Sequence, residues 1–411
     1  MLYLAQIAWI EMESEAMLMK STNKIVVIGV KYDSNLGDFL LGDCLCYLLS
    51  REIPCAQIDY IDMRGRNTVD KFENDVMAPS MHLYKRIRHL GGRILRSCFP
   101  RRSLKDEAAL KAFFEQHLSD ASVVVFAGGG IIEYKHYQSD LYIQVITAIA
   151  KERHIPVVFN AVGMLDHFNA RDKRAQALRG ILQNPNVKFI GVRENVSWME
   201  TWVDHKKNVQ LVCDPACFAS GAYDIKKDNT SNLVGIGLIR PDIFRDFNGT
   251  FTECETADLY ASVVKEFLSQ GYQCELFTNG YKGDVSLAEL MCSRHPDLLY
   301  LKDSVKNPIH AKELVETVSR YKMVFSARMH AAITSYALGI PCVTLCWADK
   351  IKAFYENIGH PERCFYTDSV EPSDAIRILV GALVEDDTVE REKYLTTSMM
   401  PIEVVKQYCA C

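Results

Sequence analysis

The stretch Lys24-Ile-Val-Val-Ile-Gly-Val30 is a short apolar run dominated by β-branched residues. A run that is apolar at consecutive positions, with no polar alternation, is typical of a strand buried on both faces of a parallel sheet. A loop containing residues 33–38 follows it, and an apolar-periodic helix is expected from Phe39 to Ser50. A strand, a loop and a helix in this order form the repeating unit of an α/β fold.

The same unit recurs along the chain in two series, which the hydrophilic stretch of residues 221–232 separates. Alternating strands and helices predict parallel sheets covered by helices on both faces. We therefore expect an α/β fold of two Rossmann-like domains facing a cleft, which binds its ligand beyond the carboxyl ends of the strands. Further strands are expected at residues 122–126, 157–160, 189–192, 210–212, 233–239, 274–277, 298–301, 323–325 and 342–345.

This pattern divides the chain into parts, and the N-terminal part is rich in apolar residues, as a targeting signal would be. Glu11, Glu13 and Glu15 interrupt its apolar residues, which argues against a secretory signal. No stretch of the chain approaches the roughly 18 apolar residues that span a bilayer. We therefore expect a cytoplasmic protein. The expected parts are a lead-in of residues 1–23, a first domain of residues 24–220, a linker of residues 221–232, a second domain of residues 233–370 and a helical tail of residues 371–411.

Fourteen cysteines are spread along the chain, many of them within apolar runs such as that at residues 342–346. A thiol in such a run acts as a small apolar side chain. This usage predicts a reducing compartment rather than a disulfide framework. The terminal Cys409-Ala-Cys411 has no second cysteine pair near it, so no zinc site is expected there.

Charge is distributed unevenly along the chain. The net formal charge of -5 gives no reason to expect a nucleic-acid partner. Residues 85–105, which we call the basic segment, nevertheless contain eight Lys or Arg and no acid, with apolar residues between them. The basic segment is either a solvated helix or a surface for anionic lipid head groups or for a diphosphate-bearing acceptor. The second alternative would place the protein peripherally at the inner face of the membrane.

Two glycine-containing loops at strand ends carry groups suited to binding. The loop Asn35-Leu-Gly-Asp38 opens the first helix, where its polar residues are either simple caps or side chains exposed at the rim of the sheet. Gly128-Gly-Gly130 directly follows a strand and offers backbone N–H groups to an anion or a sugar, although a tight turn is the plainer explanation. Its spacing is neither the dinucleotide-binding fingerprint nor a P-loop.

Two further loops add positive charge at strand ends. The guanidinium of Arg193 is expected to be free for a carboxylate or phosphate or, alternatively, paired with Glu194 or with an acid across the cleft. Arg328 and His330 lie in or beside the first turn of a helix, where the dipole and the free N–H groups favour an anion. An arginine two residues from a histidine at the mouth of a parallel sheet indicates a functional site.

Taken in order, these loops resemble those of the polysaccharide pyruvyl transferases. Members of that family have an Asn-x-Gly-Asp loop, a strand ending in three glycines, an Arg-Glu-x-x-Ser, an Asp-Pro and a late Arg-x-His. The resemblance covers about residues 24–365 and implies a GT-B-like arrangement of the two Rossmann-like domains. The matching positions are Asn35–Asp38, Gly128–Gly130, Arg193-Glu194 with Ser197, Asp214-Pro215, Arg328–His330 with Gly339 and Pro341, and Lys350, which matches a lysine common downstream.

The resemblance implies transfer of the enolpyruvyl group of phosphoenolpyruvate to two hydroxyls of a sugar in a cell-surface polysaccharide precursor. The products would be a cyclic ketal and phosphate. Phosphoenolpyruvate would be a co-substrate, a lipid-linked or oligosaccharide sugar the acceptor, and neither a cofactor nor a metal would be needed. The implied assignments are Arg193, Arg328, Lys350, Gly128, Gly129 and Gly130 to donor binding, His330 and Asp38 to catalysis, and Asn35 and His136 to acceptor binding.

Two other functions stay open on the residues alone. A glycosyltransferase with a nucleotide-sugar donor has the same two-domain architecture, and an acid such as Asp303 could bind its ribose. A non-catalytic binding subunit is the remaining alternative, and the intact Arg193, Arg328 and His330 argue against it.

Overall fold

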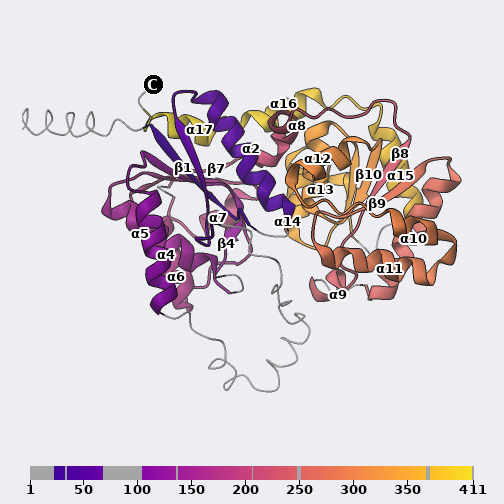
Figure 1. Cartoon of the computed structure of the whole chain (residues 1–411), viewed down its shortest axis with the longest axis horizontal. Helices are drawn as coiled ribbons and strands as arrows, with labels where there is room; N and C mark the ends of the chain where they lie inside the picture. Colours follow the sequence, from indigo (N-terminus) through magenta and orange to yellow (C-terminus); the bar gives the residue numbers. More distant parts are fainter. Residues whose placement is uncertain are drawn as a thin grey trace, which may run out of the picture.

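The computed structural model of the chain describes residues 23–32, 35–67, 104–135, 138–205, 207–247, 251–366 and 371–409. Two α/β domains, each built on a parallel sheet, lie side by side as the repeated strand–helix pattern predicts (Figure 1). His136, the lead-in up to residue 22 and the basic segment up to residue 103 lie outside the described residues.

The first sheet has the strand order β2-β1-β3-β5-β6-β7, and β4 also pairs with β5. The sequence pattern does not predict strands β2 and β4. In β2 apolar and polar residues alternate and are partly exposed, and β4 begins within the triple glycine. The strands are β1 (Lys24–Gly29), β2 (Gln57–Asp62), β3 (Val123–Phe126), β4 (Gly129–Ile132), β5 (Val157–Met164), β6 (Val187–Val192) and β7 (Val209–Leu211).

Helices cover both faces of this sheet, and β1 shows why its sequence is apolar throughout. Val26 and Ile28 point into a core shared with α4, α5 and α6. Ile25 and Val27 point the other way, into a core shared with α2 and with α17 from the end of the chain. The helices of this domain are α2 (Leu36–Glu52), α4 (Leu104–His117), α5 (Ser139–Glu152), α6 (Lys173–Leu182) and α7 (Val196–Glu200).

The second sheet has the order β12-β11-β10-β8-β9, with all its described pairs parallel. Its strands are β8 (Leu233–Gly237), β9 (Gln273–Phe277), β10 (Met323–Ser326), β11 (Cys342–Leu345) and β12 (Cys364–Phe365). Its helices are α9 (Ile243–Phe247), α10 (Glu253–Ser269), α11 (Val285–Arg294), α12 (Ala311–Ser319), α13 (Met329–Leu338), α14 (Asp349–Asn357) and α15 (Pro372–Ala382).

The strand predicted at residues 298–301 is wrong, because this segment belongs to the 3₁₀ helix η4 (Pro296–Ser304). Leu298 and Leu301 are buried, whereas Leu299 and Tyr300 are 54% and 58% exposed. Side chains three residues apart lie on the same side of a 3₁₀ helix. The apolar run therefore buries its two ends and exposes its middle, which a consecutive-residue pattern cannot distinguish from a strand.

The chain passes between the domains twice. After β7 it forms η2 (Pro215–Phe218) and α8 (Ala219–Tyr223) and then enters the second domain at β8. After α15 it forms α16 (Thr388–Thr396) and α17 (Met399–Lys406), and α17 packs on the first sheet (Figure 1). The helical tail predicted for residues 371–411 thus belongs to both domains.

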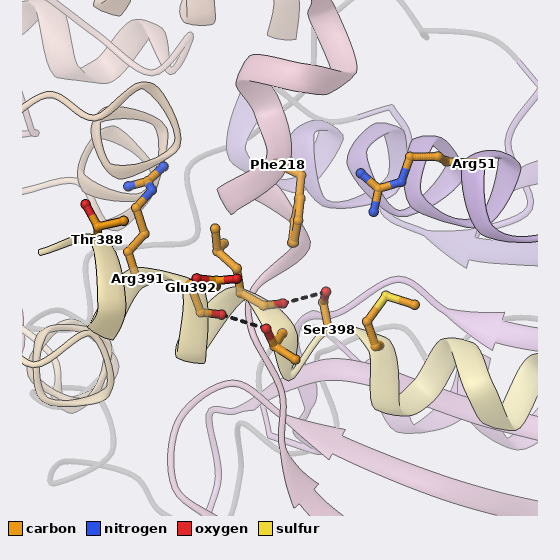
Figure 2. A pocket seen from close by; sticks show the side chains of 9 residues that line it. Arg51, Phe218, Thr388, Arg391, Glu392 and Ser398 are labelled. Carbon is orange, nitrogen blue, oxygen red and sulfur yellow. Dashed lines mark hydrogen bonds between the residues drawn. The ribbon is translucent and has the colours of Figure 1, made fainter.

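The second passage is fixed to the first domain at the junction of α16 and α17. The backbone N–H of Cys213 donates a hydrogen bond to Thr397 Oγ1 at 2.7 Å. A pocket of about 400 Å³ lies beside this junction, and Figure 2 shows Arg51, Phe218 and Arg391 among the side chains that line it.

An apolar interface joins the domains behind the cleft. Leu36, Leu40 and Cys44 of α2 share one core with residues of η2, α12 and α13. This core positions the N-terminus of α2 against the second domain.

None of the described helices is long and apolar enough to cross a membrane. Cys55 is disulfide-bonded, contrary to the expectation of thiols throughout, whereas the other described cysteines are free.

Candidate functional site

The N-termini of α2 and α13 meet in the cleft at Gly37 and His330. A Cβ atom at position 37 would lie 2.0 Å from Nδ1 of His330, so only glycine allows this approach. The backbone N–H of Leu36 donates to the carbonyl oxygen of Asn279 at 3.2 Å, which ties the same turn to the second domain. Because a helix N-terminus carries partial positive charge, the two termini together favour an anion.

His330 is buried at this meeting point, with 8% of its surface exposed. Burial, together with the positive charges of Arg193, Lys350 and Arg328, holds the pKa of the imidazole well below its usual value. The ring is therefore neutral near pH 7 in the free protein, as its place at a helix N-terminus predicts. Within the part of the chain that the structure describes, its Nε2 atom has no hydrogen-bond partner.

Arg193 follows β6 and is 3% exposed. Its Nη1 donates to Asp214 Oδ2 at 2.8 Å, and its Nε lies 3.8 Å from Glu194 Oε1. Burial opposes the charge of the guanidinium, but the two carboxylates outweigh it and raise its pKa. Nε makes no hydrogen bond to the described residues. The guanidinium is thus paired within its own domain, and its Nε edge, which faces Glu194, makes no hydrogen bond among the described residues.

Gly163 on β5 lies next to the Nε edge of the Arg193 guanidinium. A Cβ at position 163 would lie 3.2 Å from Arg193 Nε and 2.6 Å from Glu194 Oε1, so a larger residue would displace both groups. Asp214 is fully buried and also accepts the N–H of Ala216 at 2.9 Å, as the cap of η2. The Asp-Pro motif therefore fixes the arginine through a carboxylate that is itself held by the backbone.

Arg328 is the N-cap residue of α13, as its predicted place beside the first helical turn requires, and its guanidinium is paired with an acid. Both Nε and Nη2 bind the carboxylate of Asp284, with Nε at 2.8 Å from Oδ2. Asp284 is buried and also accepts the backbone N–H of Arg240 at 2.9 Å. The guanidinium lies 5.5 Å from the ring centroid of Tyr281. Arg328 is therefore held in a two-pronged ion pair within the second domain.

Lys350 lies in the first turn of α14 and is half-buried. Burial and the charge of Arg193 lower its pKa to about 8, against the opposing effect of Glu194 and Asp38. The same arginines act on both Lys350 and His330, so these four side chains occupy one region of the cleft. We call Arg193, Arg328 and Lys350, grouped around His330, the cationic cluster.

The side chain of Asn35 binds Asp38 instead of capping the helix. Its Nδ2 donates to Asp38 Oδ2 at 3.0 Å, and although Asn35 is the N-cap residue of α2, its side chain makes no capping hydrogen bond. A Cβ at Gly129 would lie 3.7 Å from Asp38 Oδ1, so the triple glycine approaches this carboxylate. The structure thus brings two of the predicted loops together.

The glycine loop has a structural role of its own. Gly128 and Gly129 have φ angles of +96° and +85°, which L side chains rarely adopt. A Cβ at Gly128 would also lie 2.9 Å from the carbonyl oxygen of Ala161. These glycines are therefore required by the turn into β4 and by its contact with β5, in addition to any ligand.

Sequence reasoning missed the loop after β9. Asn279 is 1% exposed with its Oδ1 unpartnered among the described residues, and Asp284 binds Arg328. The available signal was position: Thr278-Asn-Gly280 directly follows a strand, at the carboxyl edge where ligands bind.

A cavity of about 410 Å³ opens beside the cationic cluster, between the two domains. Lys350 belongs to its wall, so the two sites are continuous. We call this cavity the aromatic cleft. Its lining residues are Met164, Leu165, Asp166, His167, Trp198, Trp202, Phe247, Cys346, Trp347, Ala348, Asp349, Lys350 and Tyr366.

The fold is shared with enzymes that act on nucleotide sugars. A UDP-GlcNAc 2-epimerase from Methanocaldococcus jannaschii is similar with a TM-score of 0.55 and 10% identity, over 93% of this chain and 99% of that one. A putative UDP-N-acetylglucosamine 2-epimerase from Listeria monocytogenes has a TM-score of 0.53 and 9% identity, over 94% of this chain and 95% of that one. At this identity the likeness shows the GT-B-like fold alone. A comparison with curated proteins gives no match.

The family is shown by the sequence itself. The family described as polysaccharide pyruvyl transferase matches residues 35–348. This range begins in the Asn35 loop and ends directly before α14. The matched range contains the triple glycine, Arg193, Arg328 and His330, and it ends two residues before Lys350. The cationic cluster is thus built almost wholly from the family's region, and the chain belongs to the polysaccharide pyruvyl transferase family.

Proposed function

We propose that the protein transfers the enolpyruvyl group of phosphoenolpyruvate to two hydroxyls of a sugar in a cell-surface polysaccharide precursor, forming a cyclic ketal and releasing phosphate. The observation that carries this proposal is the cationic cluster, in which three positive side chains surround a buried, neutral imidazole. Phosphoenolpyruvate carries its carboxylate and its phosphate on one carbon atom. A compact donor with two anionic groups needs positive charge on more than one side.

Donor binding is assigned to groups that lack partners or can share them. The Nε edge of Arg193 has no hydrogen bond among the described residues and would receive one anionic group. Arg328 would bind the other while it stays on Asp284, because its Nη1 atom is not used in that ion pair. Lys350 and the N–H groups of Gly128–Gly130 complete the assignment, which includes no cofactor and no metal.

The reaction requires a proton on the methylene carbon of the donor and the loss of one proton from each attacking hydroxyl. Protonation produces a methyl group and an oxocarbenium-like carbon, which the first hydroxyl attacks. The bond between this carbon and the phosphate oxygen then breaks, and the second hydroxyl closes the ketal ring. One hydroxyl proton replaces the proton given to the methyl group, and the other leaves with phosphate.

His330 suits the acid and base steps because its charge depends on the donor. The imidazole is neutral in the free protein. The negative charge of a bound donor would raise its pKa, so that the imidazole takes up a proton when the donor binds. Its Nε2 atom has no competing partner in the described structure. Asp38, 3.7 Å from the Cβ position of Gly129, is proposed as the second base.

The acceptor is proposed to be a lipid-linked or oligosaccharide sugar, contacted by Asn35 and His136. The basic segment would hold the enzyme peripherally at the inner face of the membrane, where such acceptors are assembled. Its eight bases without one acid support this part of the proposal.

Phosphate release from phosphoenolpyruvate tests the function directly. The enzyme is incubated with nitrophenyl glycosides and lipid-linked sugars, and the product is examined by mass spectrometry for a pyruvate ketal. His330→Gln should lose about 10²–10⁴-fold in turnover, while His205→Gln, at an exposed histidine, should not. Sugar transfer from a UDP-sugar, with no phosphate released from phosphoenolpyruvate, would instead establish a glycosyltransferase.

A further inference from the structure

The aromatic cleft has apolar walls that are exposed to solvent in the free protein. Phe247 is 47% exposed, Tyr366 is 43% exposed and Leu165 is 41% exposed. Leu165 and Trp198 come from the first domain, whereas Phe247, Trp347 and Tyr366 come from the second. Exposed apolar side chains that gather in a cavity mark a ligand-binding groove more often than a surface accident.

Trp347 is the fixed part of this wall. Its Nε1 donates to the carbonyl oxygen of Ala327 at 2.7 Å, and the ring of Phe247 meets it edge-on at 4.8 Å between centroids. Ala327 directly precedes Arg328, so one strand end holds both the indole and the guanidinium. The aromatic wall therefore has a set position relative to the cationic cluster.

Lys350 links the two sites. Its Nζ lies 4.9 Å from the centroid of the Trp347 ring, and the positive charges of Arg193 and Arg328 help to lower its pKa. A molecule packed against this aromatic wall would thus meet the Lys350 ammonium group, which lies over the indole ring. This is the geometry required of an acceptor that must bring hydroxyl groups to the donor carbon.

We infer that the aromatic cleft binds the acceptor sugar, with a pyranose ring against the Trp347–Phe247 wall and two hydroxyls turned toward Lys350. The inference rests on the proposed function, because it takes the cationic cluster to hold the donor. A pyranose ring has a face of C–H groups and an edge of hydroxyls, which match an aromatic face beside charged groups. Asp349 at the rim adds a hydrogen-bond acceptor that suits hydroxyls and repels the phosphates of a nucleotide.

Tryptophan fluorescence offers a direct binding test. Three of the four tryptophans of the chain line the aromatic cleft. In the presence of phosphoenolpyruvate, titration with methyl glycosides of glucose, galactose, mannose and N-acetylglucosamine should give a saturable change with at least one of them. No change with any glycoside, or a larger change with UDP alone, overturns the inference.

Phe247 allows the wall to be altered without disturbing the core, because the side chain is half exposed. Phe247→Leu, which removes the aromatic face, should raise the acceptor KM roughly 3- to 10-fold. Phe247→Tyr should restore it. The KM for phosphoenolpyruvate should stay the same in both. Tyr300→Leu is the matched control, since Tyr300 is 58% exposed and lies outside the cleft.

The two proposals fail in different ways. Normal phosphate release with an unchanged acceptor KM in Phe247→Leu overturns the acceptor site and leaves the transferase intact. Saturable glycoside binding without phosphate release from phosphoenolpyruvate overturns the proposed function and leaves the sugar site standing.

Discussion

The imidazole of His330 lies against the backbone of Gly37, across the boundary between the two domains. Each residue belongs to the first turn of a helix that begins at the cleft, α13 for His330 and α2 for Gly37. The Gly in the family's Asn-x-Gly-Asp loop is thus explained by a histidine almost three hundred residues away in the sequence. The site is assembled by domain packing and not by either domain alone.

Gly37→Ala tests this contact. The added methyl group would lie 2.0 Å from Nδ1, so either the ring or the domains must shift. We expect a loss of about 1–3 kcal/mol in unfolding free energy, as in other overpacked interiors, together with a large loss of turnover. Urea unfolding and the phosphate-release assay measure the two effects.

Gly180→Ala is its matched control, because Gly180 lies in helix α6 with open space around its Cβ position. Alanine there should stabilise the protein by up to about 1 kcal/mol and leave turnover unchanged. Equal effects of the two substitutions would contradict the role given to Gly37.

The lowered pKa of His330 predicts how stability depends on pH. The unfolded chain takes up a proton on this residue near its usual pKa of 6.5, whereas the folded protein does so only at a much lower pH. The unfolded state therefore binds more protons in this window, and stability falls as pH drops below about 6.5. In urea titrations at pH 5 and pH 7, His330→Gln should show a smaller difference than the wild type. An equal difference in both would show that the imidazole is not buried neutral.

Lys350 predicts a pH dependence of donor affinity on the alkaline side. Its pKa of about 8 means that the free protein loses this charge as the pH rises through 8. Affinity for phosphoenolpyruvate, measured by calorimetry from pH 7 to pH 9, should therefore fall. Lys350→Met should bind weakly at every pH and lose this dependence, while Lys352→Met, on the same helix but paired with Glu356, should keep it.

The ion pair of Arg328 with Asp284 predicts two separable effects. Arg328→Ala should weaken donor binding by about 1.5–3 kcal/mol and also lower the melting temperature, because it leaves a buried carboxylate without its partner. Arg328→Ala combined with Asp284→Ala should recover much of the stability but none of the donor affinity. Recovery of both would mean that the arginine is structural only.

The basic segment makes a prediction about membranes. Changing four of its eight bases to Glu should abolish binding to anionic vesicles at physiological salt while turnover of a soluble glycoside persists. Sedimentation of the protein with vesicles of mixed anionic and neutral lipid measures the first effect. Vesicle binding that does not change in the variant would remove the membrane from the proposal.

The sequence predicted the strands that are apolar throughout, because burial on both faces leaves a consecutive signature. It failed at β2, whose alternating residues are half exposed, and at residues 298–301, where a 3₁₀ turn produced the same run of letters. Local patterns describe what one segment buries. They carry no information about the partner against which it is buried.

The same limit applies to the site. Arg193, Arg328 and His330 were found because each follows a strand end, and parallel strands end at one edge. Lys350 was found only through the resemblance to the family. The carboxylates that bind the two arginines, Asp214 and Asp284, could not be assigned to them, since each lies 21 or 44 residues away along the chain. The aromatic cleft was not predicted at all, because its walls come from separate loops of both domains.

The double passage of the chain has a mechanical consequence. With one connection after α8 and another at the α16–α17 junction, the domains are held at two points, and Thr397 pins the second to the first sheet. Two connections allow fewer relative motions of the domains than a single linker would. The core that α2 shares with α12 and α13 closes the same boundary, so His330 is kept against Gly37.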